Sequence, residues 1–575
     1  MRFGKCLFVL SLSVLLSACG TSSEVSLPEE KSVEILDVSD INTPKSESAI
    51  QETETSENIY QRSFEEVFGT SAMNETDSTS SPETMPTETT EETTEPPQKN
   101  YRGCIYDANG IKLTYTDLSE TGNPKRMFND DFSVCFSNIL SDDSKGLDSV
   151  YDEIMREDNN VDCTTGRSVQ VTYDALVQRA LYSYMSEIGM KGSIVVMRTD
   201  GSLMAEVSYP SYDANRYSYE YGYPSTLSNT DSPLMNKAEQ TASPGSCFKM
   251  MSEVIADKNG ITVLDDEGEW MGIHNWDWDK GGYPKENRPL ADAFRNSSNV
   301  YFAKVFEQLG EEKILEELSE MFNFENDKLI SCDFGGMRNT VFVENDGDLR
   351  RTGFGQANVK TSPVFLAALT REAIFGQMVK PFTLKAQVNS KDYTNVIEEG
   401  SQSYEVLAEY PQEYKEHLLT GMKGVAQDLG AAVPDGYTLY CKTGTAEVGR
   451  GDYLYVSGCL LNDNDNTDES PIYDDYSNYA ENGSYIIITQ LQNPDAFGFS
   501  FASNTGYIYK RIMSIVTSTY DYDGEDPCPY TDETEEETEV TQDPYENDED
   551  SAESEDEQEE TTENSDEDSE EDDEE

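Results

Sequence analysis

Alternating hydrophobic and polar positions are concentrated in the middle of this chain, in short runs of β-branched and aliphatic residues separated by turn residues. Such runs are typical of β-strands, and a short turn between two of them indicates a hairpin. The turn Thr199-Asp200-Gly201 and the stretch 449–452 each join two runs in this way. The expected strands cover residues 192–198, 202–208, 437–448, 453–461 and 484–492.

Hydrophobic residues with the three- to four-residue spacing of helices occupy the chain between and after these strands. One helix is expected to begin at Ser246, after a Pro-Gly turn, and to end at Gly260. Others are expected over 289–309, around a polar Asn-Ser-Ser-Asn break, over 363–375 and over 503–518. Strands at both ends of the region with helices between them predict an α+β fold, an antiparallel sheet covered by helices.

Two polar regions flank this core and lack the hydrophobic residues that a folded domain needs. Residues 20–99 are rich in Ser, Thr, Glu and Pro, and we expect them to form a disordered tether. Residues 521–575 hold 31 Asp and Glu and no Lys or Arg, which predicts a disordered acidic tail. The formal net charge of −72 for the 575 residues excludes nucleic acid as a partner, because its phosphates would be repelled.

The first twenty residues, MRFGKCLFVLSLSVLLSACG, have the pattern of an export signal. Arg2 and Lys5 precede an apolar stretch, 7–16, that is too short to span a membrane. The ending Leu-Ser-Ala-Cys resembles a bacterial lipobox, so residues 1–19 are expected to be a lipoprotein signal peptide with Cys19 as the lipidated residue. The protein is then expected on the extracytoplasmic face of the bacterial cell membrane, anchored by lipid. The alternative is a cysteine that follows a plain secretory cleavage site by chance.

Cysteine and histidine are too sparsely placed to suggest a metal site or a histidine-based mechanism. None of the ten cysteines forms a C-x-x-C pair, and the two histidines, His274 and His417, stand in no suggestive context. We therefore expect neither a metal nor a cofactor. If a serine acts as a nucleophile in this chain, lysine is the natural base.

The segment Ser246-Cys-Phe-Lys249 allows two interpretations of its serine. A serine at the start of a helix commonly only caps it. On a helix, however, residues three apart lie on the same face, so Lys249 would lie beside the hydroxyl of Ser246 and could activate it as a nucleophile. The unpaired N–H groups at a helix N-terminus would also stabilise an oxyanion that formed there.

Two further short motifs favour the nucleophile. Ser246-x-x-Lys249 is the only S-x-x-K in the chain, Ser297-Ser298-Asn299 begins 51 residues after its serine, and Lys442-Thr-Gly-Thr lies in an expected strand. In this order the three motifs resemble those of the active-site serine penicillin-binding proteins and serine β-lactamases. The resemblance implies a penicillin-binding transpeptidase fold, with a five-stranded antiparallel sheet covered by helices.

The flanking sequence resembles class B penicillin-binding proteins in particular. Arg-Gly-Cys-Ile-Tyr-Asp-Ala-Asn-Gly at 102–110 is similar to the start of that class, and further similar stretches lie at 171–181, 192–217 and 353–363. The resemblance implies a short N-terminal domain at 100–168 and a transpeptidase domain at 169–520. Cys247 stands where the family usually has threonine, and a lipid replaces the usual transmembrane anchor.

The resemblance also implies a role for each residue of the first two motifs. Ser246 attacks the carbonyl of a D-Ala-D-Ala peptide and forms an acyl-enzyme. Lys249 takes the proton of Ser246 and must be neutral to do so, a state that burial and a neighbouring cation favour by lowering its pKa. Ser297 relays a proton to the leaving amine, and Asn299 holds the substrate amide.

For the third motif the resemblance implies binding of the substrate's terminal carboxylate. Lys442, Thr443 and Thr445 are expected to contact that carboxylate, and Gly444 to let the substrate backbone lie against the strand. Lys442 is also the cation that would keep the first lysine neutral. The backbone N–H groups of Ser246 and Thr445 would form the oxyanion hole.

The predicted protein is thus a peptidoglycan D,D-transpeptidase that cross-links stem peptides and binds β-lactam antibiotics. Because residues 100–168 are too few for a glycan-polymerising domain, a separate glycan polymerase is an expected partner. A D,D-carboxypeptidase or a class D-like serine β-lactamase would share the acylation step but pass the acyl group to water. A non-catalytic scaffold for wall synthesis is a further alternative, although a scaffold would have no need of the two lysines.

Overall fold

The computed structural model describes residues 100–119, 124–141, 146–158, 165–400, 405–448, 451–464, 483–492, 494 and 502–527. All of them belong to one compact unit, Thr94–Glu575. The predicted signal peptide with Cys19, the tether and most of the acidic tail lie outside the described residues. In the ranges that are described, no helix is both long enough and apolar enough to cross a membrane.

Five antiparallel strands form the central sheet, in the order β18-β19-β20-β5-β6. These are β5 (Gly192–Arg198), β6 (Leu203–Tyr209), β18 (Tyr437–Glu447), β19 (Asp452–Asn462) and β20 (Tyr485–Gln492). Successive residues of β20, Ile486, Ile487 and Ile488, are all fully buried, so both faces of the sheet are covered. The predicted five-stranded antiparallel sheet is confirmed.

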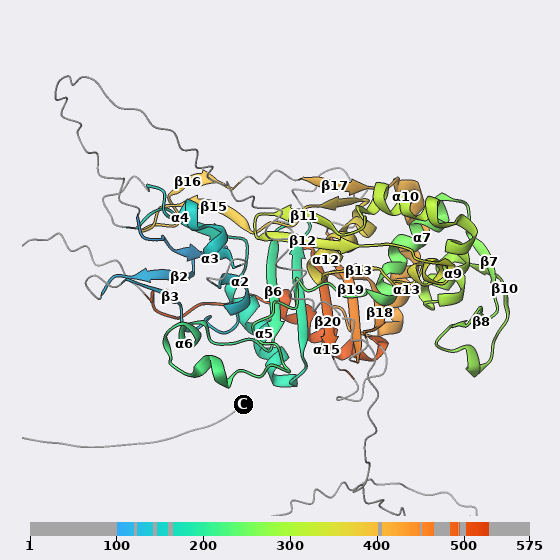
Figure 1. The fold of residues 1–575 in the computed structure, drawn as a ribbon, viewed down its shortest axis with the longest axis horizontal. Helices are drawn as coiled ribbons and strands as arrows, with labels where there is room; N and C mark the ends of the chain where they lie inside the picture. The colour runs from blue at the N-terminus through green and yellow to red at the C-terminus, as the bar shows by residue number, and fades with distance from the viewer. Residues whose placement is uncertain are drawn as a thin grey trace, which may run out of the picture. The chain divides into compact units, whose positions relative to one another are not determined.

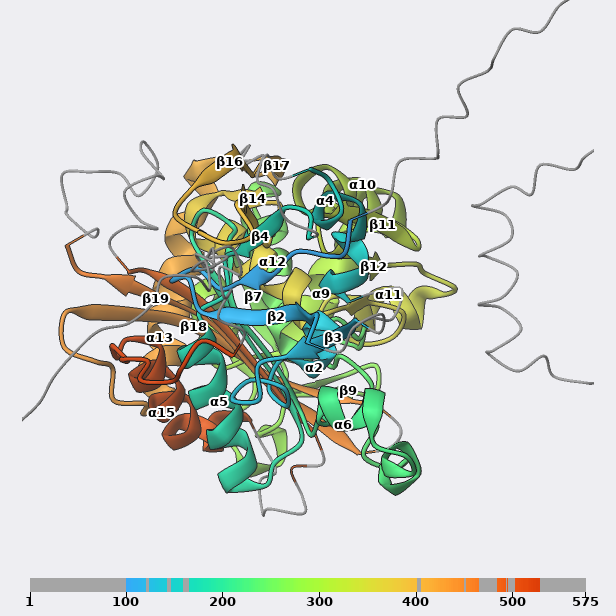
Figure 2. The ribbon, with the colours of Figure 1, turned by 90° about the vertical axis from the view of Figure 1, so that its left-hand side faces the viewer.

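Helices pack on opposite faces of this sheet (Figures 1 and 2). On one face, the buried helix α12 (Pro363–Phe375) packs on β19, β20 and β5, and Thr370 hydrogen-bonds to Ser457 of β19. On the other face, α15 (Gly506–Val516) places the Tyr509 hydroxyl against Gly458, the next residue of β19. Since adjacent strand residues face opposite sides, the two helices sandwich the sheet. Beside α15 lies α5 (Ala175–Ile188), which packs on β6.

The expected helix over 289–309 is divided at its polar break into α8 (Leu290–Arg295) and α9 (Asn299–Leu309). Ser298 causes the new start, because its hydroxyl accepts a hydrogen bond from the backbone N–H of Tyr301 and caps α9. The preceding residue, Ser297, has a φ of 54°, which lets the chain change direction between the two helices. α8 packs against α13 (Lys415–Leu429), which in turn packs on β18.

A second sheet of six strands, in the order β16-β15-β4-β1-β2-β3, was not expected. Its members are β1 (Ile105–Tyr106), β2 (Lys112–Asp117), β3 (Lys125–Phe128), β4 (Ser168–Val171), β15 (Leu384–Val388) and β16 (Val396–Glu399). β15 comes from the predicted transpeptidase domain, yet it pairs with β4, next to strands of the predicted N-terminal domain. The predicted boundary between residues 168 and 169 therefore falls within a strand of a shared sheet.

Among the remaining elements, the helix that begins at Lys249 is largely buried, and most of the others are short connections or members of small sheets. The further helices are α2 (Ser137–Leu140), α3 (Leu147–Val150), α4 (Asp152–Met155), α6 (Ala214–Tyr219), α7 (Lys249–Lys258), α10 (Glu311–Phe322) and α11 (Asp346–Thr352). The further strands are β7 (Val263–Asp266), β8 (Glu269–Trp270), β9 (Ile273–His274), β10 (Lys285–Pro289), β11 (Lys328–Cys332), β12 (Gly335–Thr340), β13 (Lys360–Thr361), β14 (Gln377–Val379) and β17 (Val406–Glu409).

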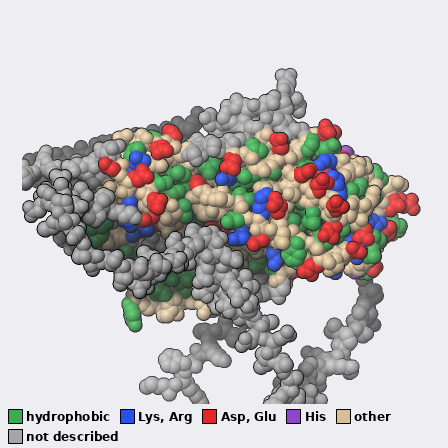
Figure 3. All heavy atoms as spheres, turned by 45° about the horizontal axis from the view of Figure 1, so that its top comes forward, with side chains coloured by type: hydrophobic (Ala, Val, Ile, Leu, Met, Phe, Trp, Pro, Cys, Tyr) green, Lys and Arg blue, Asp and Glu red, His purple; other side chains and the backbone are tan. Residues whose placement is uncertain are grey.

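The acidic excess of the folded region is dispersed over the face seen in Figure 3. Asp and Glu side chains lie across that face with Lys and Arg side chains between them. Several of the bases form surface ion pairs, including Arg295 with Asp428 and Arg350 with Glu307, each at 2.7 Å. Such exposed pairs contribute little to stability, so the charge pattern describes the surface rather than the site.

Candidate active site

Ser246 lies in a 3₁₀ turn, Gly245–Phe248, that leads directly into α7. The residue in the capping position is Pro244, so Ser246 does not cap the helix. Its hydroxyl is instead 3.0 Å from the Nζ atom of Lys249, the first residue of α7. The serine side chain is partly exposed whereas the lysine is fully buried, an arrangement that suits a nucleophile and its base better than a cap.

The hydrogen bonds of Lys249 fix where its lone pair can point. Nζ lies 2.8 Å from the backbone oxygen of Ser297 and 2.8 Å from Oδ1 of Asn299, and both oxygens can only accept. The Asn299 amide is oriented by its other end, because Nδ2 donates to the backbone oxygen of His274 at 3.0 Å. A neutral amine has two N–H groups, which these two acceptors use, and its lone pair then faces the hydroxyls.

Several features of the surroundings favour the neutral form of Lys249. Burial lowers its pKa well below the ordinary value, and the nearby cations Lys442 and Arg288 lower it further. The rings of Phe302 and Phe354 lie 5.9 Å from Nζ and exclude water from it. Its hydrogen-bond partners are neutral oxygens, so no contacting carboxylate restores the charge.

Ser297 stands between the two lysines. Its Oγ atom is 3.1 Å from Nζ of Lys249 and 3.2 Å from Nζ of Lys442. Lys442 is buried and also donates to the backbone oxygen of Thr443 at 2.9 Å. Burial lowers the Lys442 pKa to about 8. The hydroxyl of Ser297 is therefore placed to pass a proton between groups on α7 and β18.

The glycines of the site bring β18 close to the nucleophile turn. A Cβ on Gly444 would lie 2.8 Å from the Pro244 carbonyl oxygen and 2.9 Å from Sγ of Cys247. A Cβ on Gly245, which has a φ of 55°, would lie 2.4 Å from the Thr445 carbonyl oxygen. Gly444 is therefore required for packing of the strand on the turn, a role that the sequence did not indicate.

The structure brings five of the predicted side chains together and leaves two apart. Ser246, Lys249, Ser297, Asn299 and Lys442 form one hydrogen-bonded cluster. Thr443 and Thr445 follow along β18 and are partly exposed. Within the described part of the chain, their side chains form no hydrogen bond with the cluster, so they remain candidates for contact with a substrate only.

A buried polar network behind the second motif was missed at the sequence level. Oδ1 of Asn275 accepts hydrogen bonds from the backbone N–H groups of Asn299 and Val300, at 2.7 and 3.0 Å. Its Nδ2 donates to Asp266, which forms a buried ion pair with Arg288 at 2.5 Å. The network holds the start of α9 in place. The only available signal was the density of Asp, Asn and Trp between the first two motifs.

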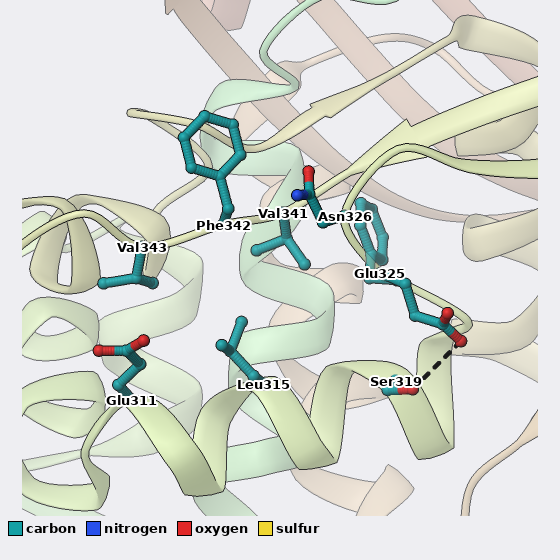
Figure 4. A pocket seen from close by; sticks show the side chains of 9 residues that line it. Glu311, Leu315, Ser319, Glu325, Asn326, Val341, Phe342 and Val343 are labelled. Carbon is teal, nitrogen blue, oxygen red and sulfur yellow. Dashed lines mark hydrogen bonds between the residues drawn. The ribbon is translucent and has the colours of Figure 1, made fainter.

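A cavity of about 320 Å³ lies away from this cluster, beside α10 (Figure 4). Figure 4 shows Leu315, Val341 and Phe342 around the hollow, with Glu311 and Glu325 at its edges. It contains none of the motif residues and is not part of the site. The described residues also contain no group of three or more His, Cys, Asp or Glu placed to hold a metal ion.

Comparison with known proteins identifies the family. Residues 192–458, which contain all three motifs, match the family model described as penicillin binding protein transpeptidase domain. Residues 192–458 are therefore a transpeptidase domain of the penicillin-binding protein type. The resemblance seen in the sequence is thus confirmed.

Curated relatives of this chain include penicillin-binding protein 3 of Bacillus subtilis (strain 168). It is 27% identical over 309 residues, which are 49% of this chain and 43% of that protein. The peptidoglycan D,D-transpeptidase MrdA of Haemophilus influenzae is 32% identical over 163 residues, which are 26% of this chain and 24% of that protein. The chain therefore spans less than half the length of these relatives.

Solved structures share the fold of this chain. The D,D-transpeptidase domain of a peptidoglycan glycosyltransferase from Eggerthella lenta has a TM-score of 0.57 and 19% identity, and the match covers 73% of this chain and 98% of that one. Penicillin-binding protein A from M. tuberculosis, in an imipenem acyl-enzyme complex, has a TM-score of 0.59 and 18% identity, covering 73% and 99%. The predicted transpeptidase fold is confirmed.

Proposed function

We propose that this protein is a peptidoglycan D,D-transpeptidase of class B type that acts through an acyl-enzyme on Ser246. Ser246 Oγ attacks the carbonyl carbon between the two D-alanines of a stem peptide, and its proton passes to Nζ of Lys249. The C–N bond then breaks and D-alanine leaves. An amine of a second stem peptide takes the acyl group, which closes the cross-link and returns the proton to Ser246. The observation that carries the proposal is the buried amine of Lys249, 3.0 Å from the hydroxyl of Ser246.

The leaving amine needs a proton, and Ser297 can deliver it. Ser297 gives its hydroxyl proton to the departing nitrogen and takes one from Lys249, 3.1 Å away. Lys442 stabilises the relay as a cation and binds the terminal carboxylate of the substrate together with Thr443 and Thr445. A β-lactam would acylate Ser246 in the same way, but its leaving nitrogen stays tethered to the acyl group.

Anchoring at the membrane is a separate part of the proposal. Cys19 carries the lipid, and residues 20–99 tether the catalytic domain at the extracytoplasmic face of the bacterial cell membrane. The support is the sequence of the first twenty residues and the polar composition that follows. A separate glycan polymerase supplies the strands. Loss of radiolabelled palmitate from a Cys19→Ala variant tests the lipid, and retention of the label by that variant would contradict it.

Peptide mapping with labelled penicillin tests the nucleophile. The full chain should carry one label on Ser246, Ser246→Ala should carry none, and the control Ser243→Ala should label normally. Label on Cys247, or normal labelling of Ser246→Ala, would overturn the assignment.

Incubation with a D-Ala-D-Ala stem peptide and an acceptor amine then separates the possible reactions. A cross-linked product supports the transpeptidase. Release of D-alanine with hydrolysis alone indicates a D,D-carboxypeptidase, and rapid hydrolysis of penicillin indicates a β-lactamase. No reaction at all with a folded chain indicates a scaffold.

A further inference from the structure

Every tryptophan of the chain lies in one short segment beside the active site. The sequence contains three, Trp270, Trp276 and Trp278, all close to the β8–β9 hairpin. Trp270 packs inward, against the cluster formed by Ile273, Val300, Ala303 and Phe354. Trp276 and Trp278 are 52% and 44% exposed. Figure 1 shows β8 near β7 and β10, on the same side of the molecule as α9. Two exposed tryptophans only two residues apart in the sequence are uncommon on a domain surface and indicate a binding surface.

The hairpin tip adds a third exposed apolar side chain. Met271 is 62% exposed and has a φ of 50°, in a two-residue turn where Asn, Asp or Gly is the usual choice. A long apolar side chain at such a position gains nothing from burial and fits the backbone poorly. Its presence points to a contact outside the folded chain.

The segment is joined directly to the second motif. The indole N–H of Trp276 donates to the backbone oxygen of Asn296 at 3.3 Å, one residue before Ser297. The backbone oxygen of His274 holds the Asn299 amide, and Asn275 holds the N-terminus of α9. The inner side of the segment therefore supports the catalytic serine, while its outer side presents the tryptophans.

Polar groups surround the exposed rings. His274 stacks on Trp278 with a centroid distance of 4.8 Å, and the ammonium of Lys280 lies 4.2 Å from the Trp276 ring. The carboxylates of Asp277 and Asp279 flank Trp278 in the sequence, and Asp277 accepts a hydrogen bond from Tyr283. Exposed aromatic rings with carboxylates close by in the sequence suit a ligand with C–H faces and hydroxyl groups. The local acids disfavour a phosphate-rich surface, because like charges repel.

We propose that His274, Trp276 and Trp278 form an aromatic platform that binds sugar rings of the glycan strand whose stem peptide is in the active site. The inference rests on the proposed function, which makes a peptide-bearing glycan the substrate. The rings stack on the C–H faces of the sugars, and the carboxylates accept hydrogen bonds from their hydroxyls. Because the platform contacts the loop of Ser297, a strand bound there delivers its peptide to the cluster. The platform thus selects glycan-linked peptides over free peptides.

Intrinsic tryptophan fluorescence is a direct probe of this proposal, because every tryptophan is in the segment. The full chain with Ser246→Ala, which cannot turn over, is titrated with a disaccharide-pentapeptide ending in D-Ala-D-Ala, with the same pentapeptide without sugar, and with the free disaccharide. Both sugar-bearing ligands should change the emission. The disaccharide-pentapeptide should bind about tenfold more tightly than the free pentapeptide. This ratio corresponds to the binding free energy of about one stacked aromatic contact.

Variants assign the preference to the platform. Trp278→Ala should abolish the tenfold preference, Trp278→Phe should keep part of it, and Tyr221→Ala should keep all of it. Tyr221 is a fully exposed aromatic residue that follows α6 and serves as the matched control. Equal affinity for the two pentapeptide ligands, or a full preference in Trp278→Ala, would overturn the proposal. So would an emission shift caused by phosphatidylglycerol vesicles but not by the sugars, which would assign the surface to a membrane.

The experiments distinguish a failure of the platform proposal from a failure of the proposed transpeptidase function. Sugar preference is measured by binding, whereas the transpeptidase is tested by acylation and cross-linking with wild-type protein. A chain that prefers the sugar-bearing ligand but forms no cross-link keeps the platform and loses the transpeptidase. A chain that cross-links free and glycan-linked peptides equally well keeps the transpeptidase and loses the platform.

Discussion

Replacing Lys249 with methionine removes the amine while keeping an unbranched side chain of similar length. The variant should acylate Ser246 with penicillin about 10²- to 10⁴-fold more slowly, which is the usual contribution of a general base. This corresponds to roughly 3 to 5 kcal/mol of barrier. The upper part of the range is expected, because Nζ both accepts the proton at 3.0 Å and orients Asn299 at 2.8 Å.

The structure also bounds what the same change does to stability. Methionine leaves the Ser297 carbonyl and the Asn299 amide oxygen without their donor, at about 1–3 kcal/mol for each buried acceptor that stays unpaired. In the opposite direction, the change removes the penalty of burying an amine, which the lowered pKa of Lys249 reveals. The two effects oppose each other, so the protein should remain folded and the loss of activity should be chemical.

Rates of labelling by penicillin, with circular dichroism and thermal melting as folding checks, measure both effects. Lys249→Arg should be equally inactive, because arginine keeps its proton at working pH. Lys423→Met, on the exposed side of α13, is the matched control and should label at the wild-type rate. A folded Lys249→Met protein that labels within tenfold of wild type would show that another group activates Ser246.

Three further changes test the rest of the site. Lys442→Met removes a cation that lowers the pKa of Lys249, so that pKa rises and the acidic limb of the acylation-rate profile should move to higher pH. The alkaline limb, which follows the Lys442 pKa of about 8, should disappear. Gly444→Ala places a Cβ 2.8 Å from the Pro244 carbonyl oxygen, so acylation should fall sharply. The overpacking should lower the free energy of unfolding by about 1–3 kcal/mol, which a lower melting temperature would report. Asn275→Ala leaves two N–H groups of α9 unpaired and should lower kcat for the stem peptide about tenfold with a smaller change in KM, since it displaces Ser297 rather than a binding group. A pH–rate profile of Lys442→Met that matches wild type would contradict the first prediction. A normal acylation rate of Gly444→Ala would contradict the second, and an effect of Asn275→Ala on KM alone would contradict the third.

The sequence predicted the parts of the fold that rest on local periodicity. β5, β6, β18, β19 and β20 are each seven to eleven residues long, contain several aliphatic, aromatic or β-branched residues and are bounded by turns, so their pattern is strong. The pairing of β15 with β4 could not be predicted, because both strands are short and more than 200 residues apart in the chain. Pairing at that distance depends on tertiary packing, which leaves no periodic signal.

In the candidate site, too, the sequence predicted what depends on local motifs and missed what depends on tertiary contacts. Ser246, Lys249, Ser297 and Lys442 were found because each belongs to a short motif whose spacing has a chemical reason. Asn275 was missed because its role comes from a single side-chain oxygen that meets the start of α9 across a loop. The function of Gly444 in packing was missed because it depends on which atoms of the nucleophile turn approach the strand.

The hydroxyls of Ser246 and Ser297 share a single lone pair on Lys249. Neutral Lys249 uses both of its N–H groups on the Ser297 carbonyl and the Asn299 amide oxygen, so its lone pair can accept from one hydroxyl only. Ser246 and Ser297 compete for that lone pair, at 3.0 and 3.1 Å. Lys442 already donates to Ser297, which directs the Ser297 proton away from β18. In the proposed reaction Ser246 uses the lone pair first, during its attack. The substrate nitrogen then takes the Ser297 proton as its bond breaks, and Ser297 recovers a proton from Lys249, so that one amine serves both hydroxyls in turn.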